Sequence, residues 1–159
     1  MSISAELIQE VVARMDALPD DESLDALVEQ FADEQPFVFA FLMTMGEDDF
    51  NDDEAELFLS LGLNVWEIMK SYKGSLPAIS EAQLEVVEDD NRDLLDALAA
   101  ESDAGFWTAT EQVVADSDQP ALLAYLVETI MDESFFVRPG NRASLFFFTK
   151  IIVDCFDQL

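Results

Sequence analysis

Residues 35–69 read QPFVFAFLMTMGEDDFNDDEAELFLSLGLNVWEIM. The pattern predicts an apolar helix, an acidic loop, and then a longer helix that is apolar on most sides. Pro36 suits the first position of a helix, where its missing N–H is not needed, and Gly46 is a natural stop. Asn51 or Asp52 can cap the second helix. Helices this apolar must be buried, so we expect this stretch at the centre of the fold.

The chain combines an apolar composition with an extreme negative charge. Half of its 159 residues are apolar, and 35 Asp and Glu against 7 Lys and Arg give a net charge of −28. Such a chain is too apolar to be a disordered acidic tail, so we expect a packed core under a shell of carboxylates. The charge disfavours direct binding to nucleic acid or anionic lipid and favours a basic protein partner. Solubility alone, or adaptation to a salt-rich cell, would explain the same charge.

The rest of the chain reads as further amphipathic helices. Ser4 can cap the first of them, Pro19 follows its end, and Ser80 opens a capping-box pattern later in the chain. We expect a helix break near Asn91, because this residue would otherwise fall on an apolar face. The sequence therefore predicts an all-α fold, a compact bundle of eight or nine helices in a single domain over residues 1–159.

The order of the opening stretch recurs from Gln119 to Phe156. Gln35 and the proline after it are matched 84 residues later by Gln119 and its proline. The longer apolar helices match with an offset of 88, and the difference falls in the loop between them, where insertions are tolerated. The recurrence favours an internal duplication. The simpler explanation is that any two buried helices after Gln-Pro look alike.

Shorter matches extend the comparison toward the front of each half. Ile3-Ser4 recurs as Ile79-Ser80, and residues 24–27 recur as residues 95–98. On this alignment the helix near residues 103–116 is an insertion. The two pseudo-symmetric halves would be residues 1–76 and 77–159, with the longer apolar helix of each half in a shared core.

The two matching loops carry opposite charge. The first, residues 47–54, is almost purely acidic, whereas the second holds Arg138 and Arg142. The simpler expectation, which we favour, is that these arginines neutralise Asp132 and Glu133 beside them. Alternatively, the two loops pair across the internal pseudo-dyad or between the subunits of a homodimer.

The sequence lacks the residues that most catalytic and metal-binding sites require. There is no histidine, one cysteine and five scattered glycines, which excludes His-based triads, His- or Cys-based zinc sites and glycine-rich phosphate loops. The acidic loop fails the calcium-loop pattern, since Glu54 stands where Gly is needed and Ser60 where Glu is needed. We assign no catalytic residue, metal ligand or cofactor. A helical protein that binds a small molecule or divalent metal, or a carboxylate-based enzyme, is the alternative function.

The sequence also predicts where the protein is found. The first residues lack the features of a signal peptide, and no apolar run approaches the roughly 18–20 residues that span a membrane. We expect a cytoplasmic protein without membrane contact. Cys155 lies among apolar neighbours and is expected to be a buried structural thiol.

The leading expectation is a non-enzymatic, acidic protein-interaction module that binds a basic partner surface, as an adaptor, inhibitor, immunity-type or chaperone-like protein does. A nucleic-acid mimic, which competes for the basic surface of a nucleic-acid-binding protein, is a sharper version. Charge would steer the partner, and aromatic rings would anchor it unless they fold back onto the core. The partner-binding candidates are Asp48, Asp49, Phe50, Asp52, Asp53, Trp107, Phe135, Phe136, Arg138 and Arg142.

Overall fold

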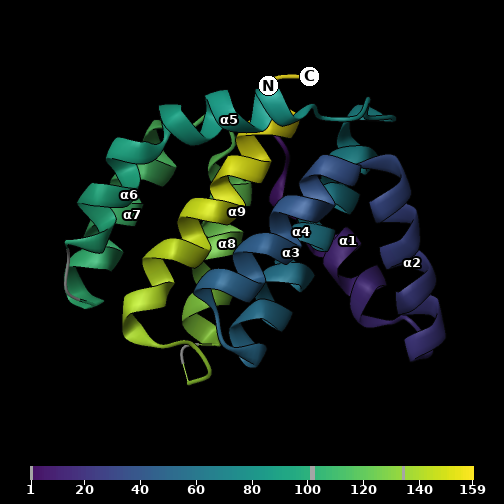
Figure 1. The fold of residues 1–159 in the computed structure, drawn as a ribbon, viewed down its shortest axis with the longest axis horizontal. Coiled ribbons are helices and arrows are strands. Elements are labelled where there is room, and N and C mark those ends of the chain that lie inside the picture. Colours follow the sequence, from purple (N-terminus) through teal and green to yellow (C-terminus); the bar gives the residue numbers. More distant parts are fainter. Residues whose placement is uncertain (1, 101–102, 134) are drawn as a thin grey trace.

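The computed structural model describes residues 2–100, 103–133 and 135–159, and the regular elements in these ranges are all helical. Figure 1 shows the helices arranged side by side around a central pair. The α-helices are α1 (Ala5–Asp16), α2 (Asp21–Glu34), α3 (Pro36–Asp49), α4 (Asp52–Lys73), α5 (Glu81–Asp90), α6 (Arg92–Ala99), α7 (Asp103–Asp116), α8 (Pro120–Asp132) and α9 (Arg142–Asp157). A 3₁₀ turn, η1 (Pro139–Asn141), leads into α9. The predicted all-α bundle is confirmed for the described part of the chain.

The centre of the fold is the pair α4 and α9, which pack against each other. Trp66 and Phe58 of α4 are fully buried, as are Phe146 and Phe156 of α9. α1 and α3 pack against α4, whereas α5, α6 and α8 pack against α9. At the two edges, α2 packs on α3 and α7 packs on α8 (Figure 1). The longer apolar helix of each half of the sequence therefore lies in the core, as predicted.

Local signals set both ends of α4. The Asn51 side-chain oxygen accepts the Glu54 N–H at 2.9 Å, and the Glu54 carboxylate accepts the Asn51 N–H at 3.0 Å. Lys70 and Lys73 occupy the last turn, where positive charge favours the helix dipole. Gly74 then ends the helix with φ 90°, a conformation that side chains disfavour. These features explain why α4 begins after Asn51, as predicted, and why it ends at Lys73.

The acidic loop is shorter than predicted, because Gly46 does not end α3. The helix continues through residues 47–49, which leaves only Phe50 and Asn51 before α4. Gly46 is buried, and a Cβ placed on it would lie 3.5 Å from the Cβ of Ala55 in α4. A glycine inside a helix costs about 1 kcal/mol relative to alanine. A Cβ at 3.5 Å would be in ordinary van der Waals contact, so the stop signal is overridden by the packing of α3 on α4 and not by a need for glycine.

The predicted break at Asn91 is confirmed, since this residue separates α5 from α6. Asn91 is buried, and its amide nitrogen donates to the Val87 carbonyl at 2.9 Å and to the Asp154 carboxylate at 3.1 Å. Its amide oxygen accepts from the Lys150 ammonium at 2.7 Å. A buried amide needs such partners. These bonds tie the corner between α5 and α6 to α9.

Two glutamines hold the starts of α3 and α8 in the same way. The backbone angles φ and ψ are −131° and 66° at Gln35 and −127° and 64° at Gln119. The Gln35 side-chain oxygen accepts the Ile79 N–H, and the Gln119 side-chain oxygen accepts the Ile3 N–H, both at 2.9 Å. Both glutamines are buried, so each satisfies a buried backbone donor. Each bond links one half of the sequence to the other.

The helices around the central pair follow a matched order. α1 packs on α4 as α5 packs on α9, and α3 packs on α4 as α8 packs on α9. α2 packs on α3, and the corresponding neighbour of α8 is α7. The sequence match of residues 24–27 with residues 95–98 instead pairs α2 with α6, so the packing order differs from that alignment.

Candidate functional site

The predicted partner-binding residues lie at helix ends and in one connecting segment. Asp48 and Asp49 end α3, Asp52 and Asp53 begin α4, and all four are exposed. Phe135 and Phe136 follow α8, Arg138 precedes η1, Arg142 begins α9, and Trp107 lies on α7 with 38% of its surface exposed. The structure therefore brings the candidates of the first loop and the second loop to the same end of α4, and it leaves Trp107 on a different helix.

Phe50 is not an exposed anchor, because its ring folds back onto the core, which is the alternative that the sequence left open. Only 8% of its surface is exposed, and its ring packs edge-on against Phe58 at 5.4 Å and Phe148 at 6.0 Å between centroids. With α3 extended to residue 49, the two-residue connection folds Phe50 back over the core. The aspartates on either side of Phe50 are exposed to water, whereas the ring of Phe50 is buried.

Phe135 and Phe136 are the exposed aromatic pair. Their side chains are 91% and 53% exposed, and the two rings meet edge to face with centroids 5.3 Å apart. Two adjacent phenylalanines in water cost free energy that a partner would recover by covering them, since aromatic rings dominate interface energetics. They are the strongest of the predicted anchors.

Arg138 pairs with Glu54 rather than with Asp132 or Glu133, so the simpler expectation is wrong for this arginine. The Arg138 Nη2 lies 2.8 Å from Glu54 Oε1, and the Arg138 backbone N–H donates to Glu54 Oε2 at 2.8 Å. Asn141 adds a bond from its amide nitrogen to Oε1 at 2.9 Å. The Glu54 side chain is completely buried, and these donors, with the N-cap N–H, satisfy it. The first loop and the second loop are thus joined within one chain.

The Glu54 carboxylate should influence stability in acid. Burial alone would raise its pKa, but the bonds from Arg138, Asn51 and Asn141 lower it from 4.5 to about 2. A pKa lower in the folded than in the unfolded chain stabilises the fold above pH 4.5, and the effect is lost as pH falls toward 2. We expect the unfolding free energies of wild type and Glu54→Gln to differ most above about pH 5 and to converge near pH 2. Urea unfolding at each pH measures this difference; a gap that stays constant with pH would contradict it.

Hollows surround the exposed face of the first half of α4. One, of about 340 Å³, is lined by Asp53, Glu56, Glu133 and Phe136, which we call the Phe136 surface. A second, of about 450 Å³, lies between α3 and α4 and shares Glu56. Carboxylates and an exposed ring therefore meet around one recessed surface, an arrangement that suits a partner with both apolar and basic groups.

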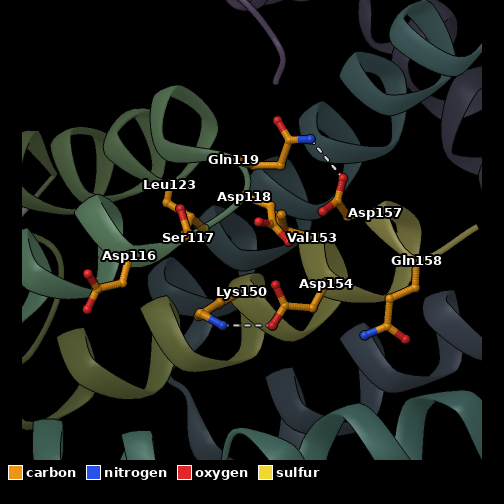
Figure 2. A pocket seen from close by; sticks show the side chains of 10 residues that line it. All are labelled: Asp116, Ser117, Asp118, Gln119, Leu123, Lys150, Val153, Asp154, Asp157 and Gln158. Carbon is orange, nitrogen blue, oxygen red and sulfur yellow. Dashed lines mark hydrogen bonds and ion pairs between the residues drawn. The ribbon is translucent and has the colours of Figure 1, made fainter. Parts of the chain in front are cut away.

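A separate acidic pocket of about 280 Å³ lies between the α7–α8 junction and α9 (Figure 2). Its carboxylates come from Asp116, Asp118, Asp154 and Asp157. Lys150, its one basic lining residue, points toward Asp154 and lies 2.7 Å from it, while Gln119 donates to Asp157 at 2.7 Å (Figure 2). The pocket suits a cationic group better than an anion. Across the described residues, no three Asp, Glu, Cys or His side chains are placed to hold a metal ion.

Cys155 is buried, as predicted, and burial together with the nearby Asp154 raises the pKa of its thiol to about 12. In the part of the chain that the structure describes, the helices are too short or too polar to cross a membrane.

Comparison of the chain with protein-family models, with curated proteins and with solved structures found no match in any of the three.

Proposed function

We propose that this protein is a non-enzymatic, cytoplasmic interaction module that binds a basic protein partner at the Phe136 surface. The observation that carries the proposal is the pair Phe135 and Phe136, exposed beside Asp53, Glu56 and Glu133. The net charge of −28 steers a basic partner over long distance, and the rings then provide the short-range contact. Adaptation to salt would explain the carboxylates but not two phenylalanines in water beside them.

The placement of the acids supports a use outside the fold. α2, α3, α5 and α8 each end in acidic residues and have no basic residue in the last turn. Negative charge near a helix C-terminus opposes the helix dipole, at a cost of roughly 0.3–1 kcal/mol per residue. Glu34 pairs with Lys70, and Glu88 and Asp89 pair with Arg92. The acids at the ends of α3 and α8, however, make no ion pair with a described residue, so a role in attracting a partner accounts for them better than a role in folding.

The other candidates have less support. Small-molecule binding or carboxylate catalysis would be centred on the pocket of Figure 2, but Lys150 there is already engaged by Asn91 and Asp154. A homodimer held by the arginine loop has less support, because Arg138 already pairs with Glu54 of the same chain. A nucleic-acid mimic remains a special case of the proposed module, in which the basic partner is a nucleic-acid-binding protein.

We also infer that residues 1–76 and 77–159 are duplicated halves, with α6 as the segment without a counterpart. The support is the matched geometry of Gln35 and Gln119, their reciprocal bonds to Ile79 and Ile3, and the matched packing of α2 and α7. On this view the shared helices are scaffold, and function lies where the halves differ. The segment with Phe135 and Phe136 is one such difference.

The double variant Phe135→Ser/Phe136→Ser should abolish partner capture without loss of stability. Wild-type protein, immobilised and exposed to an extract of the cells that make it, should retain a basic protein at low salt and release it at moderate salt, because screening weakens the charge attraction. The variant should retain less than about one tenth of that protein, as expected when aromatic anchors worth about 2 kcal/mol or more are removed. Quantitative mass spectrometry of the eluate measures retention.

The control is Leu24→Ser/Val86→Ser, which removes two exposed apolar side chains elsewhere, 40% and 58% exposed. It should retain the partner as wild type does. Equal retention by wild type and the phenylalanine variant would exclude the Phe136 surface, and recovery of no basic protein at low salt would exclude the proposed function.

A further inference from the structure

We propose a second docking site, the groove between α3 and α5, and infer that it binds a basic amphipathic helix of a partner protein. The groove has a volume of about 410 Å³. Its apolar walls include Phe37, Phe41, Met45 and Leu84, and its rim on α5 carries Glu81, Glu85 and Glu88. The inference rests on the proposed function in one respect only, that the partners of this protein are basic.

The groove exists because α3 and α5 pack less closely than the corresponding helices α8 and α1 on the other side of the molecule. α1, which follows Ile3, packs against both α4 and α8. α5, which follows Ile79 in the same way, packs against α9, and the space between it and α3 is the groove. The chain itself fills the space between α1 and α8, whereas the space between α5 and α3 is open to another molecule.

The apolar wall has the length and spacing of a helix-binding surface. Phe37, Phe41 and Met45 recur every four residues on α3, so they line one face of the helix over about 12 Å at 1.5 Å per residue. Phe37 is 46% exposed although it is a large apolar ring. A partner helix with an apolar stripe at spacings of three and four residues would cover this wall.

The charged rim has the same spacing. Glu81, Glu85 and Glu88 are separated by four and three residues, so they lie on one face of α5 over about 10 Å. Glu81 and Glu85 are exposed and make no ion pair with another described residue. Glu88 lies 3.9 Å from Arg92, which also pairs with Asp89. Lys or Arg residues at the same spacing on the partner helix would face this row of glutamates.

Charge decides which occupant fits. A second copy of this chain also carries −28, so two copies repel each other, and anionic lipid and nucleic acid are repelled for the same reason. A basic helix has the complementary charge for the rim and can supply the apolar groups for the wall. Among these candidate occupants, the groove therefore suits a basic, amphipathic helix of a partner protein.

The test uses a fluorescein-labelled synthetic peptide of 18 residues as probe, helical by design, with leucines on one face and lysines along one flank. Fluorescence anisotropy at low salt measures its affinity for the folded protein. We expect Glu81→Lys/Glu85→Lys to weaken binding by about tenfold or more, because two attractive contacts become repulsive. Phe37→Ala should weaken it by about fivefold through the lost apolar contact.

The matched control is Asp25→Lys/Glu29→Lys on α2, an exposed acidic pair four residues apart that gives the same change in net charge. It should weaken binding by less than about threefold, through the reduced overall field alone. Equal weakening by both reversals would overturn the groove as the site while leaving the proposed function intact, since the peptide would then respond to net charge only. A peptide with glutamate in place of lysine should not bind, and binding of that peptide would overturn the inference.

A second measurement does not depend on variants. Amide chemical shifts of the wild-type protein, recorded as the lysine peptide is added, should change most in α3 and α5. Shift changes centred on α4 and the segment of Phe136 would instead assign the peptide to the Phe136 surface and overturn the groove inference.

Discussion

Replacing Glu54 with alanine should lower the free energy of unfolding by about 2–4 kcal/mol and the melting temperature by roughly 5–15 °C. The carboxylate is fully buried and accepts N–H bonds from Asn51, Arg138 and Asn141. The substitution keeps the Asn51 side-chain cap on the backbone of residue 54, but it removes the reciprocal bond from the Asn51 N–H and leaves donors from separate segments without their acceptor. Urea unfolding followed by circular dichroism measures the change.

The matched control is Glu56→Ala, because Glu56 is an exposed carboxylate two residues along the same helix. Its effect should stay within about 0.5 kcal/mol, as for other surface substitutions. Hydrogen exchange adds a local readout: the amide of Arg138, which donates to Glu54, should exchange faster in Glu54→Ala than in Glu56→Ala. Equal stability of the two variants would mean that Glu54 does not hold the two loops together.

The double variant Gln35→Leu/Gln119→Leu should be destabilised by about 2–6 kcal/mol, roughly 1–3 kcal/mol for each site. Leucine has a similar size but cannot accept a hydrogen bond, so the Ile79 and Ile3 N–H groups would lose their acceptors in buried surroundings. The two sets of bonds share no residue, and we expect the two effects to add. Thermal and urea unfolding of the two single variants and the double variant test both the size and the additivity.

Gln30→Leu/Gln112→Leu is the control for this variant. Both residues are exposed helical glutamines that donate to a carboxylate four residues later, Glu34 and Asp116 respectively. Their loss should cost less than about 1 kcal/mol in total. A double variant at Gln35 and Gln119 that is no less stable than this control would show that the reciprocal bonds do not hold the two halves together.

Signals within a few residues were sufficient to predict where several helices begin. Ser4, Asn51 and Ser80 each accept the backbone N–H three residues later, as their sequence patterns indicate. The break at Asn91 and the burial of Cys155 followed from the apolar periodicity around them. Such features depend on backbone hydrogen bonds and helical spacing, which the local sequence specifies.

The candidate site was predicted only in part. Phe135 and Phe136 were named as candidates from the sequence, and both are exposed. The sequence left open whether Phe50 is exposed, because whether a ring beside carboxylates faces water depends on the direction in which the chain turns after α3. The groove between α3 and α5 could not be predicted, since it arises from the packing of helices that are about 40 residues apart.

The amino-acid sequence by itself determined the all-helical class, the helix caps, the apolar central pair and the acidic surface of this protein. Tertiary structure alone decided that Gly46 lies inside a helix, that Glu54 meets Arg138, and that Gln35 and Gln119 bond to Ile79 and Ile3. The physical reason is the distance along the sequence over which each interaction acts. Caps and periodicity act within one or two helical turns, whereas the Glu54–Arg138 contact joins residues 84 apart and forms only once α4 and α9 have packed.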